Sequence, residues 1–175
     1  TAIESTSSEV AKARKNGIPV LHRADLLAEL FNPVHGIGIA GTSGKSTVTG
    51  MVAAILDAAG ENPTVLNGGF IKNYVSPDTP GNARCGAPDL FVAEIDESDG
   101  SIAKFTPSCG VVTNISKDHK EIDELMELFS SFAAHTSGAL ALNGDCPHCR
   151  KLPAPSPVSF GLGAHSRIRA DAIRA

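Results

Sequence analysis

GIGIAGTSGKST, residues 36–47, is the stretch of this 175-residue chain that decides its fold. A short apolar run leads through small residues to Gly-Lys-Ser at positions 44–46. The usual phosphate-loop pattern is Gly, four residues, then Gly-Lys-Ser/Thr. Here Ile39 stands at the position of the first glycine, and Gly41 lies closer to the lysine. Because small residues still let backbone N–H groups turn toward a ligand at the start of a helix, the stretch predicts a phosphate-binding loop.

The residue types of this loop suit a nucleotide and its metal ion. Lys45 can reach the β- and γ-phosphates, and the hydroxyl of Ser46 can hold Mg²⁺. The alternative is a glycine- and serine-rich connection with an incidental lysine, but the apolar run before the loop and the amphipathic helix after it favour a nucleotide. We expect the nucleotide to be bound by Gly41, Thr42, Ser43, Gly44, Lys45, Ser46 and Thr47.

Strand and helix patterns alternate on both sides of the loop. Apolar residues at helical spacing, Met51 and Ile55 among them, predict a helix that starts near Lys45. Strands that alternate with helices predict an α/β fold with a mostly parallel sheet flanked by helices. Other helices are expected from about Ser8, from about Ala24 and over 122–133, and strands are expected before Ser8, at 18–21, from Ile37, and at 63–67, 89–95, 109–115, 139–143, 157–161 and 166–170.

Composition and charge exclude several classes of protein. The net charge of -4 and the pI of about 5.8 argue against nucleic acid as the main partner. No apolar run approaches the length of a membrane span, and residues 1–10 lack the zones of a signal peptide. The four cysteines do not read as a disulfide framework. We therefore expect a cytoplasmic protein.

Acidic and imidazole side chains follow two of the predicted apolar strands. Glu94 comes at the end of the strand at 89–95, and His119 follows the strand at 109–115. In a parallel sheet, ligand sites form at the carboxyl ends of the strands, next to the phosphate loop. Glu94 is therefore a candidate Mg²⁺ ligand, and His119 is expected near the same edge of the sheet.

Four motifs in this order and spacing, GTSGKST, AEIDESDGS, TNISKDH and ALNGDCP, together resemble the central ATP-binding domain of the Mur ligases. These enzymes add amino acids to the peptidoglycan precursor. DESDGS and the earlier GIPVLHRADLLAEL are most similar to the branch that joins L-alanine to UDP-N-acetylmuramate. The resemblance runs through almost the whole chain.

The resemblance implies a reaction and roles for three catalytic residues. ATP phosphorylates a substrate carboxylate to an acyl phosphate, an amine attacks it, and an amide bond forms with release of phosphate. Lys45 would stabilise the transferring phosphoryl group. Ser46 would hold one Mg²⁺, while Glu94 and His119 would take the metal near the γ-phosphate. The implied partners are a sugar nucleotide of the UDP-N-acetylmuramate type and an amino acid.

The resemblance also implies a division of the chain. Residues 1–34 would be the C-terminal part of a preceding Rossmann-like, UDP-binding domain, and residues 35–175 an incomplete central ATP-binding domain. A chain of this extent is expected not to ligate by itself. The sequence departs from the alanine-adding branch at Ser43, where that branch has histidine, at Ser46, where it has threonine, and at Lys120-Glu121, where it has Leu-Asp.

Two other functions remain open at this point. One is a generic phosphate-loop nucleotide-binding or phosphotransferase module in which Asp96 or Glu97 positions a water molecule. The other is a thiol–disulfide module at Cys-Pro-His-Cys, residues 146–149, which requires Cys146 to be exposed with a lowered pKa. A zinc site that combines these cysteines with Cys85 or Cys109 would need further ligands.

Overall fold

A computed structural model describes residues 7–118, 120–155 and 157–172 of the chain. The described residues contain one eight-stranded sheet in the order β3-β2-β4-β1-β5-β6-β7-β8. Each neighbouring pair is parallel except β2 with β3, so the predicted α/β class with a mostly parallel sheet is confirmed. The strands are β1 His35–Ala40, β2 Pro63–Leu66, β3 Ala83–Arg84, β4 Ala87–Glu94, β5 Cys109–Val112, β6 Leu140–Asn143, β7 Val158–Gly161 and β8 Ile168–Arg169.

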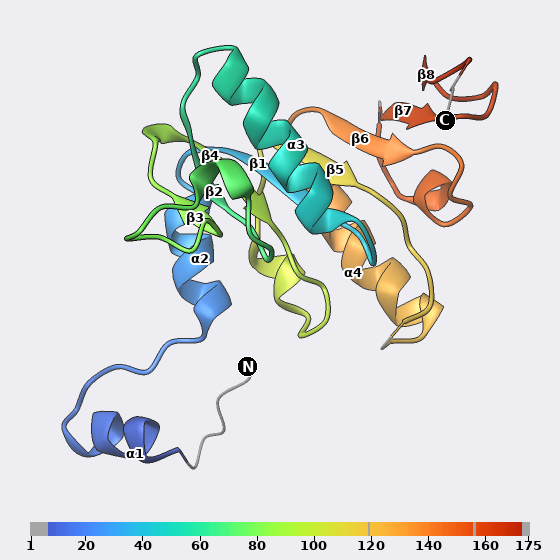
Figure 1. The fold of residues 1–175 in the computed structure, drawn as a ribbon. Coiled ribbons are helices and arrows are strands. Elements are labelled where there is room, and N and C mark those ends of the chain that lie inside the picture. The colour runs from blue at the N-terminus through green and yellow to red at the C-terminus, as the bar shows by residue number, and fades with distance from the viewer. Residues whose placement is uncertain (1–6, 119, 156, 173–175) are drawn as a thin grey trace.

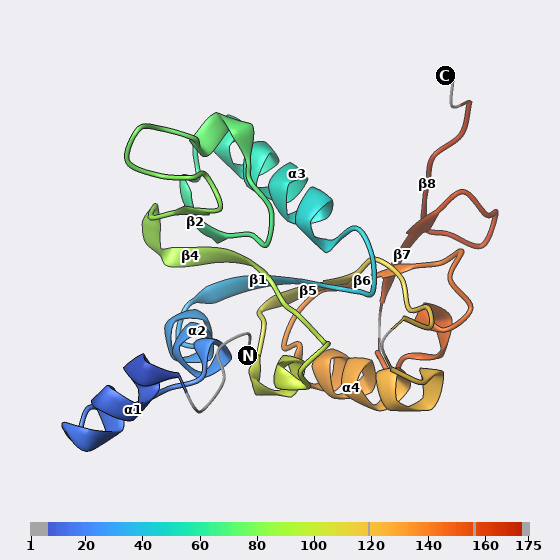
Figure 2. The same ribbon diagram turned by 60° about the horizontal axis from the view of Figure 1, so that its bottom comes forward.

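Helices cover both faces of the sheet. The α-helices are α1 Ser8–Lys15, α2 Arg23–Phe31, α3 Lys45–Ala58 and α4 Ile122–His135, and the short 3₁₀ helices are η1 Lys72–Tyr74, η2 Ser101–Lys104 and η3 Cys149–Lys151. Figure 2 shows α3 on one face of the sheet and α2 and α4 on the other. Helix α1 has no buried residue and lies away from the sheet (Figure 1). No helix in the described ranges is long and apolar enough to cross a membrane.

Strand β1 lies at the centre of the sheet and needs small residues on one face. A Cβ atom at Gly36 would lie 2.4 Å from the ring of Phe31, and one at Gly38 would lie 3.3 Å from the ring of Phe132. The aromatic rings of α2 and α4 therefore pack directly on the backbone of β1. On the opposite face, the buried Ile39 packs in the core beneath α3.

Helix α3 buries only some of the apolar residues that its sequence places at helical spacing. Ala53 is fully buried, and Val48, Val52 and Leu56 pack against the core around it. The helix forms as its apolar spacing predicts, but Met51 is 60% exposed and Ile55 is 66% exposed, so these two residues lie outside the buried stripe. The reason is geometric, because α3 contacts the sheet on one side and the described residues place no second layer over its outer side.

The strand predicted at residues 18–21 is also absent from the structure. This segment connects α1 to α2 without strand pairing. Ile18, Val20 and Leu21 are exposed, so their β-branched and apolar side chains contribute little packing. Pro19 lacks an N–H group for a ladder, and a run of high β-propensity forms a strand only where a partner strand is available. The strand end predicted before Ser8 lies outside the described residues.

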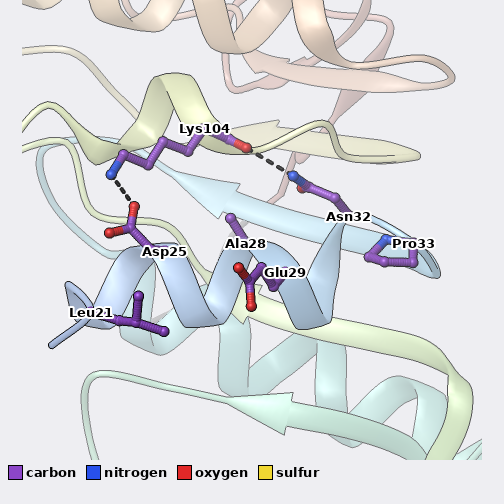
Figure 3. Close-up of a pocket in the computed structure, with 7 residues that line it drawn as sticks. All are labelled: Leu21, Asp25, Ala28, Glu29, Asn32, Pro33 and Lys104. Carbon is purple, nitrogen blue, oxygen red and sulfur yellow. Dashed lines mark hydrogen bonds and ion pairs between the residues drawn. The ribbon is translucent and has the colours of Figure 1, made fainter. Parts of the chain in front are cut away.

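Helix α2 packs against the sheet and is hydrogen-bonded to η2. Its buried residues Leu27, Ala28 and Phe31 join the core on the α4 face. Asn32 donates a hydrogen bond of 2.9 Å to the carbonyl oxygen of Lys104, and the ammonium group of Lys104 pairs with the carboxylate of Asp25 (Figure 3). Lys104 holds the pKa of Asp25 below its ordinary value. The assignment of residues 1–34 to a preceding domain stays a prediction.

Candidate phosphate-binding site

The loop between β1 and α3 lies at the carboxyl edge of the sheet. Gly44 is the N-cap of α3 and has a φ of +81°, a left-handed conformation that glycine adopts without strain. No side chain caps this helix. The first N–H groups of a helix lack intrahelical partners, so the N-terminus of α3 keeps donors and a partial positive charge for an anion.

Gly41 explains why the first glycine of the usual pattern is absent. Strand β1 continues to Ala40, and Ile39 is fully buried within it. The chain turns at Gly41, which has a φ of +138°. A Cβ atom there would lie 2.0 Å from Oγ1 of Thr113. The glycine is therefore required where the turn begins, two positions later than in the general pattern.

Lys45 is held at this loop by two partners. Its ammonium group donates hydrogen bonds of 2.8 Å to the carbonyl oxygen of Gly41 and to Oε2 of Glu97. Asp96 lies further away, with 3.9 Å between Nζ and Oδ1. Glu97 is only 6% exposed, so this is a largely buried ion pair. The candidate catalytic set of the ligase prediction does not contain Glu97, which the sequence analysis names only for the generic alternative, as a residue that positions water.

Ser46 and Glu94 are in direct contact. The Ser46 hydroxyl donates to Oε2 of Glu94 at 2.7 Å, and the N–H of Gly68 donates to the same oxygen at 2.8 Å. The parallel pairing of Ile39 with Glu94 brings the end of β4 beside the loop. Hydroxyl and carboxylate oxygens are the donors that Mg²⁺ prefers, so the two residues fit the ion that the sequence predicts.

The segment after β5 holds the phosphate loop in place. Oδ1 of Asn114 accepts from the hydroxyl of Thr42 at 2.5 Å and from the N–H of Ser43 at 3.1 Å. Thr113 donates to the carbonyl oxygen of Ser43 at 2.6 Å, and Ser116 lies 2.9 Å from the Thr42 hydroxyl. Sequence reasoning did not name these residues as site residues, because only the pairing of β5 with β1 brings them to the loop.

Two other predicted site residues are Thr47 and His119. Thr47 is exposed in the first turn of α3 and lines a hollow on the surface. His119 lies outside the described residues. The contact between Ser116 and Thr42 brings the segment that leads toward it to the phosphate loop.

The hollow beside α3 has a volume of about 380 Å³. Its walls include Ser46, Thr47, Asn67, Gly69 and Phe70. Oδ1 of Asn67 is buried and has no hydrogen-bond partner among the described residues. A buried acceptor without a partner carries a desolvation cost, which a rearrangement of Asn67 toward the hollow would relieve.

The Cys-Pro-His-Cys motif does not form the exposed site that a thiol–disulfide module requires. Cys146 is 9% exposed and Cys149 is fully buried. Burial acts to raise the pKa of Cys146, but hydrogen bonds from Cys149 and Ile115 outweigh it and hold that pKa below its ordinary value. No three His, Cys, Asp or Glu side chains within the described ranges are grouped to hold a metal ion, so the zinc alternative finds no support there.

Comparison with known sequences identifies the family. Residues 39–175 match the sequence model of the Mur ligase middle domain. The chain belongs to the Mur ligase family. The phosphate loop, Glu94 and the Asn114 segment thus all lie within the Mur ligase middle domain.

Two curated Mur ligases resemble the chain over nearly all of its length. The UDP-N-acetylmuramate–L-alanine ligase of Rubrobacter xylanophilus is 44% identical over 179 residues, which cover 97% of this chain and 39% of that protein. The enzyme of the same name from a Cyanothece strain is 41% identical over 170 residues, which cover 93% of this chain and 34% of that protein. The chain thus spans less than two fifths of the length of these relatives.

A solved Mur ligase structure has the same fold. The UDP-N-acetylmuramate–alanine ligase of Thermotoga maritima superimposes with a TM-score of 0.77 at 25% identity. The matched region covers 91% of this chain and 37% of that one.

Proposed function

We propose that the chain carries the ATP site of an amide-forming ligase of peptidoglycan precursor synthesis. Its substrates would be ATP, a sugar nucleotide of the UDP-N-acetylmuramate type and an amino acid, L-alanine, as the names of its relatives say of those proteins. The carboxylate of the sugar nucleotide is first phosphorylated, and the amine of the amino acid then displaces phosphate from the acyl phosphate.

Phosphoryl transfer of this kind depends on positioning and charge neutralisation. Lys45 supplies a fixed positive charge at the N-terminus of α3, where the backbone N–H groups orient the phosphates. Ser46 and Glu94 would hold Mg²⁺, which when bound neutralises negative charge on the phosphates. His119 is proposed as a further ligand near the γ-phosphate.

The observation that carries the proposal is the convergence of three groups at one edge of the sheet. The uncapped N-terminus of α3 and the Lys45 ammonium lie at the loop, and the Ser46–Glu94 pair joins the first turn of α3 to the end of β4 beside them. The hollow next to Ser46 would offer the sugar nucleotide a place beside the phosphates.

Calorimetric titration of the chain with ATP, with and without Mg²⁺, tests the proposal. Lys45→Ala should remove measurable binding, and Lys12→Ala, a change of a lysine on the remote helix α1, should leave it unchanged. His119→Ala should weaken Mg²⁺-dependent binding. Unchanged binding in Lys45→Ala would refute the phosphate site. Loss in Lys45→Ala with no effect of His119→Ala would favour a generic nucleotide-binding module instead.

A further inference from the structure

Cys146 and Cys149 are separated by one turn of helical backbone. The N–H of Arg150 donates to the carbonyl oxygen of Cys146 at 3.3 Å, and η3 begins at Cys149. Both thiols are free, and both belong to the core on the α4 face of the sheet. Two cysteines at this spacing in a helical turn have side chains on one face, close enough for a disulfide.

The two thiols differ in their surroundings. The N–H of Ile115 donates to Sγ of Cys146 at 3.4 Å, and the backbones of His148 and Cys149 and the Cys149 side chain add further hydrogen bonds. These bonds outweigh burial and hold the pKa of Cys146 below its ordinary value. Burial raises the pKa of Cys149, and its neighbour Cys146 raises it further. Cys146 is therefore the thiol that ionises first.

We propose that Cys146 and Cys149 form a redox-sensitive modification site, in which a small peroxide converts the two thiols reversibly into an intramolecular disulfide. The limited exposure of Cys146 restricts the oxidant to a small molecule and excludes exchange with the disulfide of another folded protein. The proposal is independent of the proposed ligase function, because the reaction uses only these two side chains and the peroxide.

The chemistry balances in two steps. The Cys146 thiolate attacks one oxygen of hydrogen peroxide, the O–O bond breaks, and sulfenic acid and hydroxide form. The sulfur of Cys149 then attacks the sulfenic sulfur, the S–O bond breaks, and the disulfide and water form. The hydroxide takes up the proton that Cys146 released on ionising, so in sum two thiols and one peroxide give one disulfide and two waters. A dithiol reductant reverses the reaction by thiol–disulfide exchange.

The site is connected to the phosphate loop through one residue. Cys146 also donates its thiol proton to the carbonyl oxygen of Ile115, with 3.6 Å between the atoms. Ile115 lies between Asn114 and Ser116, which hold Thr42. A disulfide has no thiol proton, so this hydrogen bond is lost on oxidation. We expect the segment after β5 to shift. The affinity for ATP should then fall by about threefold or more.

Peptide mapping of the intact chain tests the modification directly. The chain is treated with hydrogen peroxide, the remaining thiols are alkylated, and the disulfides are located by mass spectrometry before and after dithiothreitol. The expected product is a Cys146–Cys149 disulfide that dithiothreitol removes. The exposed Cys85 is the internal control. Alkylation of Cys146 and Cys149 under conditions that oxidise Cys85 would overturn the proposal.

Two variants test the order of the steps. Cys149→Ala should accumulate sulfenic acid at Cys146, which dimedone traps, whereas Cys146→Ala should give no trapped product at Cys149. Equal trapping in both variants would show that Cys146 is not the attacking thiol. If a variant fails to fold, the mapping of the unaltered chain still decides the proposal.

ATP titration of the oxidised and reduced chain tests the connection to the loop, with Cys85→Ser as the matched control background. Equal affinities would overturn the connection and leave the disulfide result standing. Because the mapping uses no nucleotide, failure of ATP binding and failure of disulfide formation are separate results.

Discussion

Lys45 and Glu97, 52 residues apart in the chain, form an ion pair with 2.8 Å between Nζ and Oε2. The lysine expected to meet phosphate is already neutralised by a carboxylate from the turn after β4. Both side chains are largely buried, at 13% and 8% exposure. A nucleotide therefore has to take over from Glu97 as the main partner of Lys45.

Glu97→Gln should lower the stability of the nucleotide-free chain and tighten ATP binding. Removing one partner of a fully buried pair costs about 3–5 kcal/mol because it leaves the other charge unpaired, and the partial exposure of Lys45 makes this an upper range. Phosphate groups then restore the missing negative charge. Thermal unfolding with and without Mg²⁺-ATP should show a lower melting temperature and a larger ligand-induced rise than in the unaltered chain.

Asp96→Asn is the matched control for that change, because Asp96 lies 3.9 Å from the ammonium group and is more exposed. Asp96→Asn should change the melting temperature and its ligand-induced rise less than Glu97→Gln does. Weaker ATP binding in Glu97→Gln would mean that Glu97 contacts the bound nucleotide or its metal ion rather than competing with it.

Gly41 and Gly44 should differ sharply in their tolerance of alanine. Gly41→Ala places a Cβ atom 2.0 Å from Oγ1 of Thr113 at a φ of +138°, and clash and strain together should cost about 3 kcal/mol or more. Gly44→Ala meets nothing within 4 Å and carries only left-handed strain, about 1 kcal/mol. Urea unfolding of both variants measures the difference, and equal losses would contradict the close packing at Gly41.

Asn114→Ala should weaken ATP binding without removing any group that we place on the nucleotide. The change deletes the side-chain bonds to Thr42 and Ser43, and the loss should be about tenfold in affinity. Ser116→Ala removes only one hydroxyl contact to Thr42 and should have a smaller effect. Calorimetry gives both values. An effect of Ser116→Ala equal to that of Asn114→Ala would speak against Asn114 as the main support.

Tyr74 offers a test of the segment between β2 and β3. Its hydroxyl donates to Oδ2 of Asp57 at 2.6 Å, and Arg84 pairs with the same carboxylate and lies over the ring. Burial, and then this hydrogen bond, raise the pKa of Tyr74 to about 12. The chain has one tyrosine and no tryptophan, so ultraviolet absorbance titration reports this phenol alone. Asp57→Asn should move the midpoint down toward 10.

The raised pKa of Tyr74 also fixes the sign of its effect on stability. The protonated phenol is favoured in the folded state, so its contribution is complete below pH 10 and is lost as the pH rises toward 12. The hydrogen bond from Arg84 is the main reason that the pKa of Asp57 lies below its ordinary value of 3.8. The contribution of Asp57 to stability is therefore present above pH 3.8 and is lost on acidification. In Tyr74→Phe, the alkaline loss should disappear and the acid loss should remain.

Periodicity and loop chemistry were sufficient to predict the central fold. The apolar run from Ile37, the helix after Lys45 and the strand ending at Glu94 were predictable because each pattern is local and each element has a partner nearby. The same rules failed at residues 18–21, because β-propensity says nothing of whether a neighbouring strand exists.

Contacts across the sheet were harder to predict. Glu97 is one of several acids in DESD, and only the fold of the turn after β4 brings its carboxylate rather than that of Asp99 to Lys45. Asn114 is a common loop residue until β5 is placed beside β1. Pairings over 50 to 70 residues depend on strand order, which periodicity does not encode.

The attachment of Thr42 and Ser43 to the segment after β5 has a consequence for the entropy of binding. The loop is ordered by its own hydrogen bonds before a ligand arrives. If the loop became ordered only on binding, the lost conformational entropy would oppose binding by about 1–2 kcal/mol for each backbone residue. In this protein the loop is ordered when the chain folds, so the entropy cost does not reduce the affinity for phosphate. The exchange of Glu97 for phosphate as the partner of Lys45 still reduces it.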